Sequence, residues 1–238
     1  LSDAKNVAAT LKKELGGVDD ELDLTQSTKE ALALAQAFNI DVNEAIRAAG
    51  GIVKRDLAGN TSEALQLLLE LGQKTGLGFE EMLEIINEFG GDLNALGIEG
   101  VQGFSMMADL VERRVTPQLD QAGELFQELN ETIITGGAAE ALERIGFNAA
   151  DMQEKIAGGG PQAAQAVADI SNKILGLDTD AAQAAAAAEI FGGNMGIMGK
   201  EARTAALEIF ATSTATSELG TSLKDGVKDY ENAASGLD

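Results

Sequence analysis

Apolar residues recur along this chain at the intervals of an α-helix, three or four positions apart. The clearest stripe consists of Phe79, Met82, Leu83, Ile86 and Phe89. This spacing places the apolar side chains on one face of a helix, where they can pack against a core. Sustained alternation of apolar and polar residues, which would predict strands, is absent from the sequence. The pattern therefore predicts an all-α protein with about a dozen helices of ordinary length.

Polar residues and glycines mark where these helices are expected to begin and end. Ser27–Glu30 and Asn60–Glu63 have the spacing of a capping box, in which a polar N-cap residue is followed three places later by glutamate. Pro161 suits the first turn of a helix that follows three glycines. Glycine pairs are expected to end helices, and they occur at residues 16–17, 50–51 and 90–91.

Short corners join the predicted helices. Each corner has Gly or Asn, then an apolar residue, then a residue suited to an N-cap. The corners begin at Asn39, Gly76, Gly146 and, more loosely, Gly176, and Leu96–Ile98 is a weaker copy. Their uneven spacing does not fit a solenoid of fixed period. We therefore expect successive helical hairpins with short Gly/Asn-capped corners, without a period, around a thin core of Ala, Leu and Ile.

Three regions are predicted along the chain. Residues 1–26 form an N-terminal helix and an acidic linker, the linker being the run 18–24. Residues 27–211 form the helical hairpin body, which includes an amphipathic helix over 115–130 with an acidic face and an alanine-rich helix over 180–190. Residues 212–238 form a weakly ordered or helical tail. Because the chain begins with Leu1, we expect it to be an internal piece of a longer protein.

Composition removes several classes of function. The chain has 39 Asp and Glu against 17 Lys and Arg, a formal net charge of −22. Such a charge opposes binding to a nucleic-acid backbone, so no nucleic-acid partner is predicted. No apolar run is long enough to span a bilayer. The absence of Cys and His excludes the usual zinc sites, thiol nucleophiles and imidazole bases.

The remaining candidate sites have ordinary structural explanations, a flexible loop between helices for residues 193–201 and a helix N-terminus for residues 178–189. Residues 193–201 resemble a phosphate-binding loop, but Asn194 and Glu201 replace its first glycine and its Ser/Thr. Residues 178–189 have the spacing of a calcium loop, but lack its glycine and fit a helix N-terminus better.

Carboxylate pairs are too frequent for one to stand out as acid and base, and Asn60 fits an N-cap better than a glycosylation site. The methionines fit core packing, with an adaptable binding patch as the alternative, at Phe104 with Met106 and Met107, and at Met195 with Met198. We therefore predict no catalytic, cofactor-binding or metal-binding residue, and no cofactor.

The corners and the alanine-rich helices together resemble phage tail tape measure proteins. In that family, a run of Gly–apolar–cap corners leads to a glycine-rich turn and an alanine-rich helix that ends in apolar-Phe-Gly. Here the turn is Gly158–Pro161, and the helix ends at Ile190-Phe191-Gly192. The resemblance is clearest over residues 72–210. No functional residue is transferred, because the matching motifs are not an active site in that family.

The resemblance implies a structural, non-enzymatic protein of the virion, located inside the tail and in the host cytoplasm during assembly. Such a protein acts as a scaffold and length ruler for the tail tube and leaves the tube ahead of the DNA. Its implied partners are tail tube and tail-tip proteins and tail assembly chaperones, and self-association is left open. The alternatives are a non-catalytic helical adaptor or secreted effector of bacterial origin, and a carboxylate-based wall-degrading domain.

Overall fold

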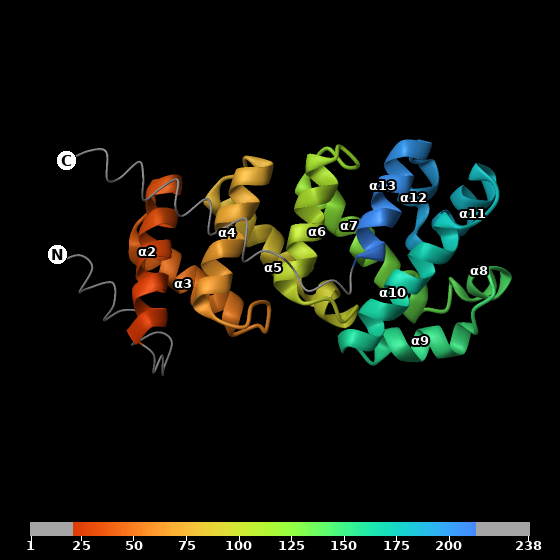
Figure 1. Cartoon of the computed structure of the whole chain (residues 1–238), viewed down its shortest axis with the longest axis horizontal. Helices are drawn as coiled ribbons and strands as arrows, with labels where there is room; N and C mark the ends of the chain where they lie inside the picture. Colours follow the sequence, from red (N-terminus) through yellow and green to blue (C-terminus); the bar gives the residue numbers. More distant parts are fainter. Residues whose placement is uncertain (1–20, 213–238) are drawn as a thin grey trace. The chain divides into compact units, whose positions relative to one another are not determined.

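The computed structural model describes residues 21–212, and these residues contain twelve helices and no strand (Figure 1). The all-α prediction is therefore confirmed for the described part of the chain. The predicted N-terminal helix, the glycine pair at 16–17 that is expected to end it, and the predicted tail beyond residue 212 lie outside the described residues. The predicted region limits at 26 and 211 stay predictions. Packing divides the chain into two compact units, with the division between Leu83 and Glu84.

The described part of the first unit holds helices α2 (Glu21–Phe38), α3 (Val42–Val53) and α4 (Thr61–Thr75), and the first residues of α5 (Phe79–Ala95). Helix α2 packs on both α3 and α4, and α3 packs on α4. The core of this unit is built mainly from leucine and alanine. Its buried residues include Leu34, Ala45, Ile46, Ala64, Leu65, Leu67, Leu68 and Leu71.

The second unit holds the rest of α5 and eight further helices. They are α6 (Gly100–Glu112), α7 (Leu119–Ile134), α8 (Ala139–Arg144), α9 (Ala149–Ala157), α10 (Gly160–Leu175), α11 (Asp180–Phe191), α12 (Gly193–Ile197) and α13 (Lys200–Ala211). Helix α10 packs on α9 and α13, while α7 packs on α6 and α11. The core has more aromatic content than the sequence suggested, because Phe210 lies between Phe126 and Phe191, with ring centroids 4.8 and 5.0 Å away.

Most of the predicted corners form as the capping pattern indicates. Asn39, Gly76, Gly97 and Gly146 all have positive φ, which is the left-handed conformation expected after a helix end. The next helices are capped too: Asp41 accepts a hydrogen bond from the Asn43 amide at 2.8 Å, and Asn148 accepts one from Asp151 at 2.9 Å. The loosest corner differs, because Gly176 has a φ of −82° and Thr179 is the N-cap.

The predicted start of the helix at Ser27 is wrong. Ser27 does not cap a helix, because α2 begins at Glu21 and residues 21–24 of the predicted linker are helical. Instead, the Glu30 carboxylate accepts hydrogen bonds from Ser62 at 2.6 Å and Gln66 at 2.7 Å on α4. The pattern Ser-x-x-Glu here joins two helices through a half-buried polar network.

The glycine pairs 50–51 and 90–91 do not end their helices, since α3 continues to Val53 and α5 to Ala95. Apolar residues beyond each pair are buried, Ile52 in one case and Leu93 in the other. Burial of these side chains outweighs the roughly 1 kcal/mol that each helical glycine costs relative to alanine.

Candidate functional site

The segments that resembled ligand-binding loops form ordinary helix ends. Residues 193–197 form the short helix α12, and Gly199 precedes α13, so the predicted flexible loop between helices is largely helical. In the calcium-like segment, the Thr179 hydroxyl caps α11 by accepting the Ala182 amide at 3.2 Å. Among the described residues, no three acidic side chains converge in a way that could hold a metal ion.

The methionine groups separate into two kinds. Met106, Met107 and the adjacent Phe104 are buried in the core, as is Met195. Met198 is only half buried and lines a cavity. The core interpretation therefore holds for the first group and for Met195, whereas Met198 lies at the edge of a cavity.

The turn between α11 and α12 is fixed to α7 by polar contacts. The Thr132 hydroxyl of α7 donates a hydrogen bond to the Ile190 carbonyl at 2.5 Å. The Glu128 carboxylate accepts one from the Asn194 side chain at 2.9 Å. Gly192 has a φ of 95°, and a Cβ added there would lie 2.1 Å from a Glu128 oxygen. The close approach requires glycine, and it positions α12 beside α7.

Arg203, a buried arginine of α13, holds the residue that follows α12 in place. Arg203 of α13 is 3% exposed; it donates to the Met198 carbonyl at 2.9 Å and forms an ion pair with Asp180. Removing a guanidinium from water is costly, so these partners are what make its burial tolerable. The three helices α7, α11 and α13 thus hold α12 and the segment after it in a defined position.

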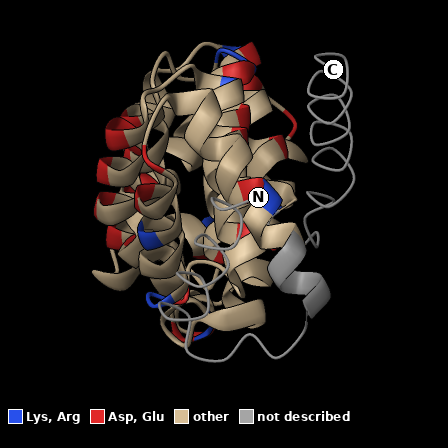
Figure 2. Ribbon diagram, turned by 90° about the vertical axis from the view of Figure 1, so that its left-hand side faces the viewer, with Lys and Arg blue, Asp and Glu red and all other residues tan. Residues whose placement is uncertain are grey.

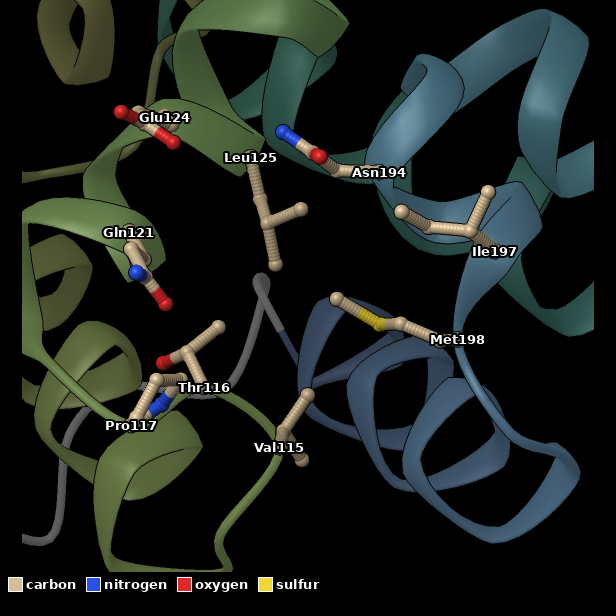
Figure 3. A pocket seen from close by; sticks show the side chains of 9 residues that line it. All are labelled: Val115, Thr116, Pro117, Gln121, Glu124, Leu125, Asn194, Ile197 and Met198. Atoms are coloured by element: carbon tan, nitrogen blue, oxygen red, sulfur yellow. The ribbon is translucent and has the colours of Figure 1, made fainter.

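A cavity of about 320 Å³ lies between three parts of the chain (Figure 3). They are α12 with Met198 directly after it, helix α7, and the loop that precedes α7. The cavity walls carry apolar groups from all three parts, and the cavity edge carries polar ones. The lining residues are Val115, Thr116, Pro117, Gln121, Glu124, Leu125, Asn194, Ile197 and Met198. Sequence reasoning missed this site, because it joins positions about 80 residues apart in the chain, and among the methionine candidates only Met198 lines it.

Asp41 is a charged group whose properties follow from its place at a helix end. The pKa of the Asp41 carboxyl is lowered because the backbone N–H and the side chain of Asn43 both donate to it. Asp41 is an exposed N-cap, so this pKa shift reflects helix capping. Acidic side chains outnumber basic ones over the described helices (Figure 2).

The family profile of phage-related minor tail proteins matches residues 1–192, most of the chain. The chain belongs to this family. Its family therefore places it among phage tail proteins. Membership of a structural tail family favours a non-enzymatic role.

This minor tail protein is also 24% identical over 167 residues to a protein of Streptomyces phage phiC31 named "Probable tape measure protein". The match covers 69% of the present chain but only 23% of that relative, so the chain spans about a quarter of the relative's length. No solved structure matches the chain. No helix among the described residues has both the length and the apolar character needed to cross a membrane.

Proposed function

We propose that this chain is a segment of a tail tape measure protein, acting as a scaffold and length ruler for the tail tube. The observation that carries the proposal is the match to the minor tail protein family over residues 1–192 together with the tape measure relative. The helical structure supports it, because a helix has a fixed rise per residue and so converts chain length into distance. Tail tube proteins, tail-tip proteins and assembly chaperones are the proposed partners.

The corners between the helices determine whether the chain is extended or folded into hairpins. As one continuous helix at about 1.5 Å per residue, the chain would measure about 360 Å. The corners instead close the helices into hairpins within each unit, as between α9 and α10. We infer that the hairpins are the state of the free chain, and that the chain is drawn out during tail assembly. A rod-like scattering profile of the isolated chain in solution would contradict this.

The charge supports the proposal that the chain leaves the tube ahead of the DNA. A protein with a net charge of −22 is repelled by phosphates, so it would not adhere to the DNA that follows it. The proposed location is the virion tail, with assembly in the host cytoplasm. A clear band shift of the chain on duplex DNA at moderate salt would contradict the argument.

The test of the ruler is a deletion in a phage whose tail gene carries this segment. Removing residues 84–216, the second unit, should shorten the tail by about 200 Å if these residues lie extended as helix in the tube. Electron microscopy of purified virions measures this length directly. Tails of unchanged length would reject the ruler and favour the adaptor alternative. Clearing of cell-wall substrate by the purified chain in a zymogram would instead revive the wall-degrading alternative.

A further inference from the structure

The cavity beside α12 has an exposed apolar edge. Ile197 is 85% exposed, the highest exposure among the large apolar side chains of the described residues. It lies next to Met198 and faces the cavity wall formed by Val115 and Leu125 (Figure 3). Leaving an isoleucine in water forgoes about 25 cal/mol for each Å² that could be buried. Together with Met198 and Leu125, Ile197 gives the cavity an apolar edge that another side chain could cover.

A buried hydroxyl at the same cavity lacks a partner. Thr116 is 4% exposed, and its Oγ1 has no hydrogen-bond partner among the described residues. It lies on the side of the cavity formed by Pro117 and Gln121 (Figure 3). Buried polar groups in proteins are nearly always hydrogen-bonded. The oxygen is itself buried, so an occupant of the cavity could satisfy it only if the Thr116 side chain rotates.

The size and charge of the cavity indicate what the occupant is. Its volume, about 320 Å³, is at the lower end of the range for small-molecule pockets, so it suits one or two protein side chains. Glu124 lies on its rim. Glu124 is the one charged residue among those that line the cavity, and the whole chain has a net charge of −22. The charge favours a basic occupant and disfavours a second copy of this acidic chain.

We propose that this cavity is a docking site for a basic amphipathic segment of another protein. The segment inserts an aliphatic side chain between Leu125 and Met198, covers Ile197, and places a Lys or Arg beside Glu124. Apolar burial provides the affinity and the negative charge selects the charge of the partner. This inference concerns one surface of the isolated chain, so it stands or fails separately from the ruler function.

The experiment uses fluorescence anisotropy with the full chain and a labelled probe peptide of about four helical turns, roughly 14 residues. The probe has leucine along one face and lysine at the other positions, and a matched control peptide has glutamate in place of lysine. We expect the lysine peptide to bind, with affinity that falls as salt rises, and the glutamate peptide not to bind. Equal binding of both peptides would overturn the proposal.

Two matched variants separate docking from general attraction of opposite charges. Ile197→Asp should weaken binding of the lysine peptide about tenfold or more, because it removes the apolar anchor. Ile134→Asp makes the same change at a 47% exposed isoleucine of the same unit that does not line the cavity. It should leave the affinity unchanged or slightly higher. Both variants add a negative charge, so equal or stronger binding to Ile197→Asp would overturn the proposal.

Two further measurements test the other occupants. Sedimentation velocity of the chain at increasing concentration should show no association that Ile197→Asp abolishes; such association would assign the cavity to a second copy. A synthetic peptide of residues 213–238 should not compete with the labelled probe. Competition would assign the cavity to the chain's own C-terminal residues and overturn the proposal.

Discussion

Gly97, in the corner between α5 and α6, is the position where an added methyl group should be most harmful. Its φ is +67°, in the left-handed region. A Cβ at this position would lie 2.3 Å from both the backbone nitrogen and the carbonyl oxygen of Gly160, and 2.8 Å from the Cβ of Ala163. The obstacle is mainly backbone, which cannot rotate away as a flexible side chain would. The corner and the start of α10 must therefore separate in the variant Gly97→Ala.

The expected loss of stability has two parts. Holding a non-glycine residue in the left-handed region costs roughly 1–2 kcal/mol. Forcing an extra methyl group into a packed site costs typically about 1–3 kcal/mol more. Gly97→Ala should therefore lower the free energy of unfolding by about 2–5 kcal/mol, a large fraction of the stability of an ordinary domain.

Two variants of the same unit provide matched controls. Gly136 has a φ of +77° with nothing within 4 Å of an added Cβ, so Gly136→Ala should show the backbone cost alone. Gly91 lies inside α5 with open space around it, so Gly91→Ala should raise stability by about 0.5–1 kcal/mol. Urea unfolding, monitored by circular dichroism, measures the free energy of unfolding of all three variants. If Gly97→Ala is no more destabilising than Gly136→Ala, the packing argument is refuted.

Three smaller predictions follow from single contacts. Asp180→Asn should lower the free energy of unfolding by about 1–3 kcal/mol in urea melts, because it leaves the buried Arg203 without its countercharge. Asn60→Ala should lower it by about 1 kcal/mol through loss of the α4 cap, with retained stability as the contradicting result. The pKa of Asp41 should lie below its ordinary value in an NMR titration. Its stabilising contribution is then present at neutral pH and is lost as the pH falls through that lowered pKa, and Asn43→Ala should raise the pKa.

Local capping signals could be read from the sequence with success. Asn60 accepts a hydrogen bond from the Glu63 amide at 2.9 Å, as its spacing predicted. The left-handed positions at Asn39, Gly76 and Gly146 were also identified correctly, because they depend on a few adjacent residues. These signals established the fold class and the positions of most corners.

Features that depend on distant partners could not be read in this way. Ser27 has the same local spacing as Asn60, but its segment lies within α2, and Glu30 instead contacts α4 more than thirty positions away. Gly123 accommodates the ring of Phe89, since an added Cβ would lie 2.4 Å from it, yet it carries no sequence signal of that role. The cavity beside α12 was missed for the same reason.

The ruler function is tested most directly by tail length as a function of the number of residues. In-frame deletion and tandem duplication of residues 149–175, the α9–α10 hairpin, change the chain by the same amount in opposite directions. If the segment lies as extended helix in the tube, virions should show tails about 40 Å shorter and about 40 Å longer than the parent, a slope of about 1.5 Å per residue. Tails of the parental length in both phages would contradict the proposed function.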